Sequence, residues 1–166
     1  MPNQGRAVGV CVGLETHIET QLTAAGLTAD IRRIWHPKFK AEDLAATPIV
    51  TIRPSDKPNP SLRRRQSVIE IAITQRLPAT DDASEDPYNQ LDELDELDFL
   101  AEVIGDLFMV FDPDEKPRDT AGALSTVVID GQMPVAVEYR VIIDAQSMDT
   151  NRQFLAVILV TYQVSD

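Results

Sequence analysis

The chain has 166 residues and a mass of 18.4 kDa, which fits one domain with a single core better than two. Fifteen lysines and arginines against 27 aspartates and glutamates give a net charge of −12. A surface this acidic repels nucleic-acid phosphates and anionic lipid, which argues against a nucleic-acid grip or a membrane-surface role. Hydrophobic residues make up 43% of the chain, too many for a disordered protein. We therefore expect one soluble, globular domain spanning residues 1–166.

A single cysteine, Cys11, suits a reducing compartment, because it cannot form an internal disulfide. The longest apolar run, residues 154–160, is seven residues long, whereas a membrane-spanning helix needs about 20. Residues 7–14 are apolar but lack a small-residue cleavage site, so they do not predict a signal peptide. We expect neither secretion nor a membrane segment.

Residues 6–25 predict an amphipathic helix, because apolar residues recur there at three- and four-residue spacings. Gly26 follows and predicts the end of that helix. The residues of the apolar stripe are Val8, Cys11, Leu14, Ile18 and Leu22.

Three extended segments follow, at residues 29–35, 47–53 and 67–77. The third alternates, with isoleucines on one face and Glu70, Ala72 and Thr74 on the other, which predicts a sheet with at least one covered face. Residues 54–61 (PSDKPNPS) are rich in proline and polar side chains and predict a projecting loop that can serve as a contact arm. The isoleucines are Ile69, Ile71 and Ile73.

Residues 87–111 carry the strongest periodic pattern and predict a long amphipathic helix that covers the sheet. Two prolines in the loop at residues 112–122 end it. Its acidic residues lie opposite the apolar stripe. The stripe consists of Leu91, Leu94, Leu97, Leu100 or Ala101, Ile104, Leu107 and Phe111.

The C-terminal third predicts a return to strands. Segments 123–130 and 134–144 flank Asp130-Gly131, a dipeptide that favours tight hairpin turns. Segment 152–164 is apolar on both faces, so both faces must be buried. It is either a central strand with a layer on each side or a strand that a neighbouring subunit covers. The expected fold is α+β, with a mixed, mostly antiparallel sheet covered by two main helices.

No arrangement of residues in the sequence meets the needs of catalysis or of a cofactor. Residues 81–106 hold eleven acids and no lysine or arginine, but they lack a calcium-loop pattern and predict a solvated or repulsive surface. The histidines, His17 and His36, lack the clustered partners of a metal site. No nucleophile elbow or phosphate-binding loop is present, and Gly9 to Gly13 lacks the Lys-Ser/Thr end of such a loop. We expect no enzyme, no cofactor and no bound metal.

The densest cluster of positive charge in the sequence is the run Arg63, Arg64 and Arg65. Strand pairing can bring Arg32, Arg33 and Arg76 near it. Such a run can bind nucleic acid, but two features argue against that here: no aromatic residues alternate with the arginines, and the chain as a whole is acidic. The favoured interpretation is a contact with carboxylates of another subunit, because arginine pairs with them bidentately. A chain with separate acidic and basic surfaces can assemble head to tail into a ring.

The order of elements resembles the tail terminator, or tail completion, proteins of long-tailed bacteriophages and related tail-like particles. The resemblance rests on an opening helix, strands containing PIVTIRP and VIEIAI, a long helix around LDFLAEVIGDLF and a closing strand FLAVILVTYQV. It covers nearly the whole chain and depends on element order and size, since the family has no catalytic signature. The loop at residues 54–61 and the hairpin at Asp130-Gly131 depart from the family's leanest pattern.

The resemblance implies a hexameric ring that caps the tail tube, ends tail assembly and joins the tail to the neck of the head. The implied partners are further copies of the chain, the tail tube protein and a neck stopper or connector protein. Phage DNA would pass through an acidic channel without specific binding. The protein would be made in the bacterial cytoplasm and reside in the virion, at the junction of tail and neck. The candidate contact residues are Pro54, Lys57, Pro58, Arg63, Arg64, Arg65, Asp114 and Lys116.

Three other interpretations remain open. A head-tail connector or stopper protein has a similar size to a tail terminator and also forms rings. A small oligomeric enzyme could assemble a site between subunits from His17, His36 or the acidic cluster. An acidic binding module would instead be a stable monomer with a defined small-molecule pocket.

Overall fold

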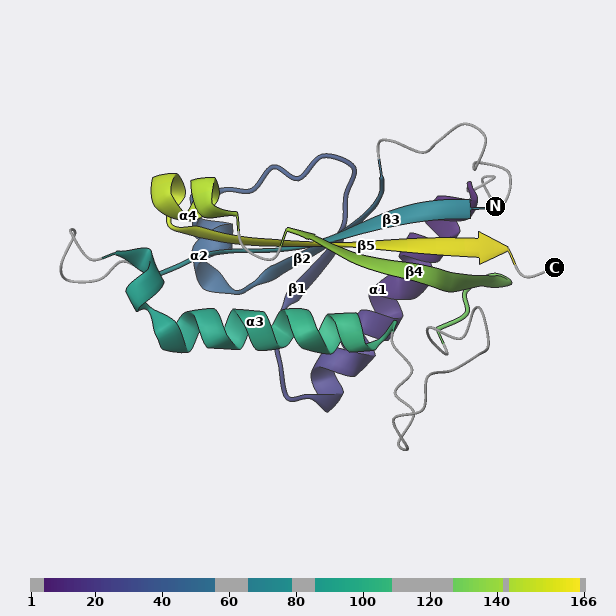
Figure 1. Cartoon of the computed structure of the whole chain (residues 1–166), viewed down its shortest axis with the longest axis horizontal. Helices are drawn as coiled ribbons and strands as arrows, with labels where there is room; N and C mark the ends of the chain where they lie inside the picture. The colour runs from purple at the N-terminus through teal and green to yellow at the C-terminus, as the bar shows by residue number, and fades with distance from the viewer. Residues whose placement is uncertain (1–4, 56–65, 79–85, 109–126, 142–143, 165–166) are drawn as a thin grey trace.

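A five-stranded sheet with strand order β1-β2-β3-β5-β4 forms the centre of the molecule (Figure 1). The computed structural model describes residues 5–55, 66–78, 86–108, 127–141 and 144–164. β1 and β2 are parallel, and every other neighbouring pair is antiparallel, which confirms the predicted α+β class with a mixed, mostly antiparallel sheet. The strands are β1 (Asp30–Arg33), β2 (Ile49–Pro54), β3 (Gln66–Arg76), β4 (Gln132–Val141) and β5 (Gln153–Val164).

Two long helices cover one face of the sheet and two short helices lie on the other, within the described residues (Figure 1). The long helices, α1 and α3, match the two predicted from sequence, whereas the short helices, α2 and α4, were not predicted. A 3-10 turn, η1, precedes α3. Their bounds are α1 (Arg6–Ala24), α2 (Ala41–Ala46), η1 (Pro87–Asn89), α3 (Leu91–Asp106) and α4 (Ala145–Asn151).

α1 ends where the sequence predicts. Gly26 adopts a left-handed backbone with φ of 72°, which favours glycine because it has no Cβ. The backbone N–H of Leu27 reaches back over this residue to donate to the carbonyl of Leu22, at 2.8 Å. This bond satisfies a carbonyl that the helix end would otherwise leave open. The apolar stripe is also confirmed: Cys11, Leu14, Ile18 and Leu22 are buried, and Val8 is half-buried.

α3 is shorter than the predicted segment 87–111. Its regular turns begin at Leu91, after η1, and end at Asp106, while Phe111 lies outside the described residues. The prediction that Leu91 belongs to the buried stripe is wrong, because this first helical residue is 63% exposed. The other predicted stripe residues, up to position 107, are buried or half-buried as expected. Leu97, Leu100, Ala101 and Ile104 are buried, and Leu94 and Leu107 are half-buried.

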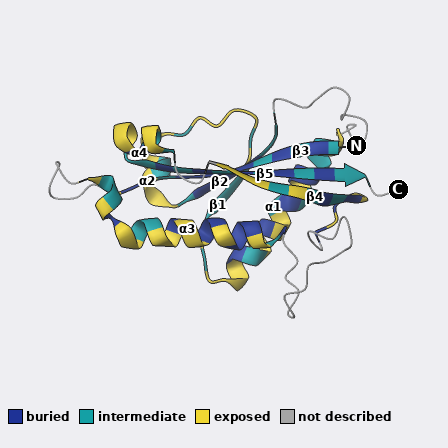
Figure 2. Ribbon diagram, viewed as in Figure 1, coloured by how far each residue is buried: buried dark blue, intermediate teal, exposed yellow. Residues whose placement is uncertain are grey.

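The sheet face toward α1 and α3, here called the inner face, holds the core (Figure 2). Ile71 of β3 is in register with Ile52 of β2 and Ile158 of β5, and all three side chains are fully buried. α1 packs against β1, β2 and β3, while α3 packs against β5 and against α1. The predicted alternation of β3 therefore places its isoleucines in the core, as expected.

The predicted tight turn at Asp130-Gly131 is confirmed. Both residues have positive φ angles, 50° and 70°, and Ile129 exchanges two backbone hydrogen bonds with Gln132. Of the strand expected over residues 123–130, only the last four residues are described. This turn packs on α1: a Cβ added at Gly13 would come within 2.6 Å of the Cγ2 atom of Ile129. The glycine thus permits a close approach between helix and turn.

Candidate interaction surfaces

Of the eight residues proposed as contacts from sequence, the structure describes Pro54 alone. Pro54 is the last residue of β2 and is half-buried. The loop expected at residues 112–122 and most of the loop expected at 54–61 also lie outside the described residues. The other seven candidates outside that description are Lys57, Pro58, Arg63, Arg64, Arg65, Asp114 and Lys116.

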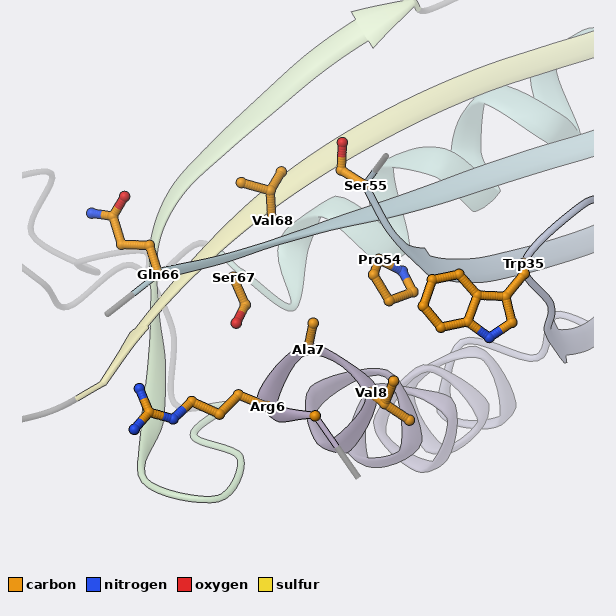
Figure 3. A pocket seen from close by; sticks show the side chains of 10 residues that line it. Arg6, Ala7, Val8, Trp35, Pro54, Ser55, Gln66, Ser67 and Val68 are labelled. Atoms are coloured by element: carbon orange, nitrogen blue, oxygen red, sulfur yellow. The ribbon is translucent and has the colours of Figure 1, made fainter. Parts of the chain in front are cut away.

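Pro54 lines a hollow of about 830 Å³ between the start of α1 and the adjoining ends of β2 and β3. Figure 3 shows the indole of Trp35 beside the ring of Pro54, with Ala7 and Val8 of α1 opposite. The side chain of Arg6 extends along its border (Figure 3). The walls are therefore largely apolar, with a cation at the border.

A network of polar contacts holds Trp35 at this hollow. Nη1 of Arg53 donates to the backbone carbonyl of Trp35, at 3.1 Å. Nε of the same arginine donates to Oε1 of Glu70 at 2.8 Å, and Nη2 lies 2.8 Å from the same oxygen. The two side chains are only 18% and 16% exposed, so water screens this ion pair weakly. The chain at Trp35 is thus fixed to the sheet while its indole is 59% exposed.

Trp35 was not among the candidate contact residues named from sequence, although the residues around it form a recognisable pattern. Residues 32–40 read RRIWHPKFK, with four lysines and arginines, two aromatics and no acid. Interleaved cations and aromatics are the features whose absence weighed against the arginine run at 63–65. In the structure, the guanidinium of Arg32 lies 5.8 Å from the ring centroid of Phe39 and 2.6 Å from the carboxylate of Asp30. The hydrogen bonds that the Arg32 guanidinium donates to the Asp30 carboxylate raise the pKa of Arg32.

The outer face of the sheet is only partly covered. α2 packs against β3 and α4 against β5, and they cover one end of the face, where Ile49, Thr51 and Thr74 are buried (Figure 2). On β5, the outward side chains of Leu155, Val157 and Leu159 stay half-buried. The sequence left open whether segment 152–164 is a central strand between two layers or a strand covered by a neighbouring subunit; in the structure β5 is central, between β3 and β4. Within the described residues, its second cover is incomplete.

The outward face of α3 combines carboxylates with two large apolar side chains. Phe99 is 49% exposed and Leu91 is 63% exposed. Three acids stand one helical turn from Phe99 on the same face, and all three are exposed. They are Asp95, Glu96 and Glu102.

The titratable groups of the described residues do not assemble into a reactive centre. His17 and His36 are both exposed, one on α1 and the other in the segment after β1. No three His, Cys, Asp or Glu residues in the described ranges are placed to hold a metal ion. The Cys11 thiol is buried, and burial raises its pKa to about 12, so it stays protonated at neutral pH. No described helix is long and apolar enough to cross a membrane.

No protein-family model matches the chain, and no curated protein matches it in sequence.

Proposed function

We propose that the protein is a structural subunit of a tailed bacteriophage or phage-like particle. In this role it acts as a tail terminator, forming a hexameric ring that caps the tail tube, ends tube growth and joins the tail to the neck. The order of elements that resembles this family suggests the role, and one feature of the fold supports it.

The supporting observation is the half-open outer face of β5. A strand in the middle of a sheet needs apolar side chains on both faces only where both faces are covered. The inner face carries Ile158 and Val160, which are fully buried, whereas Leu159 between them is half-buried. Contiguous apolar surface that the described residues cover only in part is suited to contact with another protein. A subunit whose apolar surface is covered only when it joins an assembly is expected to show such partly covered side chains.

The charge of the chain is compatible with the same role. Six copies, each with a net charge of −12, form a strongly acidic ring. An acidic channel wall repels the phosphates of passing DNA and keeps it from binding. The exposed carboxylates of α3 are candidates for such a wall or for a contact between subunits.

The test is the mass of the purified protein, measured by light scattering over a concentration series and paired with negative-stain images. We expect closed rings of about six subunits with a central hole, since a head-to-tail contact whose rotation closes forms a ring. A chain that stays monomeric up to about 1 mM, where even weak contacts are populated, contradicts the proposal. Localising the protein within a particle then separates a tail terminator from a neck connector or stopper.

A further inference from the structure

Two surfaces of opposite charge lie on different sides of α1. The first, here called the acidic surface, consists of Asp95, Glu96, Phe99 and Glu102 on the outward face of α3. α3 packs beneath β5, next to the edge strand β4. The second surface lies at the start of α1, toward β1 and β2. With α1 between them, the two surfaces of one chain cannot meet each other.

The second surface, here called the basic surface, consists of Arg6, Arg33 and Trp35 around the hollow that Pro54 lines. A smaller hollow of about 180 Å³ adjoins the first, shares Trp35 and Pro54 with it and adds Arg33 to the lining. The cations therefore border an apolar depression that has an exposed indole in its wall (Figure 3).

We propose that the acidic surface of one copy docks on the basic surface of the next copy, and that this head-to-tail contact builds the ring. The inference rests on the proposed function and specifies its interface. The occupant is a second copy of the chain, because each surface has on the same molecule the complement that it needs. Two different surfaces that bind each other in successive copies make a heterologous contact, which closes into a ring when the rotation permits.

The chemistry of the two surfaces matches in kind as well as in sign. Phe99 projects from among carboxylates, and Trp35 and Pro54 line a depression bordered by arginines. An aromatic side chain that enters an apolar depression is the usual centre of a binding interface, with charged groups at its rim. Arginine pairs bidentately with carboxylates, so Arg6 and Arg33 can fix the orientation around the aromatic contact. The contact should weaken as salt screens its charged rim.

Two half-defective variants test this contact. The first combines Trp35→Ala with Arg33→Glu and loses the basic surface but keeps the acidic one. The second combines Phe99→Ala with Glu102→Lys and loses the acidic surface but keeps the basic one. We expect each variant alone to associate at least about thirtyfold more weakly than the wild type, the loss typical of a central aromatic residue in an interface. All four side chains are exposed, so both variants should fold.

Mixing the two variants should restore one contact. The intact acidic surface of the first variant meets the intact basic surface of the second, so the mixture should form dimers and nothing larger. Trp35 is the only tryptophan of the chain, and the first variant lacks it. Titrating the first variant into the second therefore gives a change of tryptophan emission that reports this contact alone.

Charge-matched controls separate the contact from the overall charge. Glu19→Lys on α1 changes an exposed acid as Glu102→Lys does, and Arg76→Glu changes an exposed arginine as Arg33→Glu does. Both controls should assemble like the wild type. If either half-defective variant also assembles like the wild type, or if the mixture stays monomeric, the inferred interface is wrong while the ring proposal stands. A wild-type protein that never associates overturns both.

Discussion

The two faces of the sheet differ in how completely the described part of the chain covers them, and β5 shows the difference within one strand. Phe154, Ala156, Ile158, Val160 and Tyr162 point to the inner face and are all buried. The alternate residues point to the outer face and stay half-buried, although three of them are as apolar as their neighbours. The inner face thus holds most of the buried apolar side chains among the described residues. On the outer face, the described residues leave the apolar side chains of Leu155, Val157 and Leu159 half-buried.

The largest expected effect comes from truncating adjacent residues on opposite faces. Ile158→Ala removes a fully buried side chain and should lower the free energy of unfolding by about 2–5 kcal/mol, because it leaves a cavity in the core. Leu159→Ala removes a half-buried side chain of similar size and should cost less than half as much in the isolated subunit. Urea unfolding of both variants at a concentration where the wild type is monomeric measures the difference. Equal losses would contradict the contrast between the faces.

The inner face is also the part of the fold that sequence periodicity predicts best. Ile69, Ile71 and Ile73 alternate with more polar residues, and burial of one face of a strand produces that alternation. The stripe of α1 follows from the same cause at helical spacing. These patterns arise because a fully covered face tolerates few polar residues, so the sequence carries a readable constraint there.

The elements on the outer face carry a weaker constraint, which explains why they were missed. α2 has six residues and none of them is buried, so no apolar period marks it. α4 has seven residues, and its clearest signal is its N-cap. The Asp144 carboxylate accepts hydrogen bonds from the backbone N–H of Gln146 and the hydroxyl of Ser147. Trp35 belongs to no regular element, and its place depends on Arg53, which is distant in sequence. A local pattern cannot report such a contact.

An intermediate effect is expected from the ion pair that fixes the backbone at Trp35 to the sheet. Glu70→Gln removes the negative charge beside the poorly exposed guanidinium of Arg53 and should cost about 1–3 kcal/mol. Loss of the anchor should also increase the mobility of the indole, which lowers the fluorescence anisotropy of the single tryptophan.

The Lys40–Glu42 pair provides the matched control for this substitution. These side chains are 79% and 78% exposed at a separation of 3.7 Å. Because an exposed pair contributes little, Glu42→Gln should leave both the stability and the anisotropy unchanged. If Glu70→Gln behaves like Glu42→Gln, the ion pair does not position Trp35.

The smallest effect at neutral pH is expected at Cys11, which lies in the core beneath the inner face. Burial raises the pKa of its thiol from an ordinary value of 9.0 to about 12, although nearby Arg33 acts in the opposite direction. Below pH 9 the thiol is protonated in the folded and unfolded states alike, so it adds no pH dependence. Between pH 9 and about 12 the unfolded chain releases a proton that the folded chain retains. Stability should therefore fall as pH rises through this window, with a slope approaching about 1.4 kcal/mol per pH unit from this group.

Cys11→Val removes that contribution while nearly preserving the volume of the side chain. At pH 7 the variant should lose less than about 1.5 kcal/mol, and above pH 9 its stability should decline less steeply than that of the wild type. The buried Tyr162 hydroxyl remains in both proteins; its pKa is raised first by burial and then by the charge of the Cys11 thiolate, so the difference between the two curves reports the thiol together with its effect on Tyr162. Reaction with a thiol reagent at pH 8 gives a second measurement, since a buried protonated thiol reacts only when the core opens. Labelling of the folded protein as fast as that of an unfolded peptide would show that α1 does not seal the inner face at Cys11.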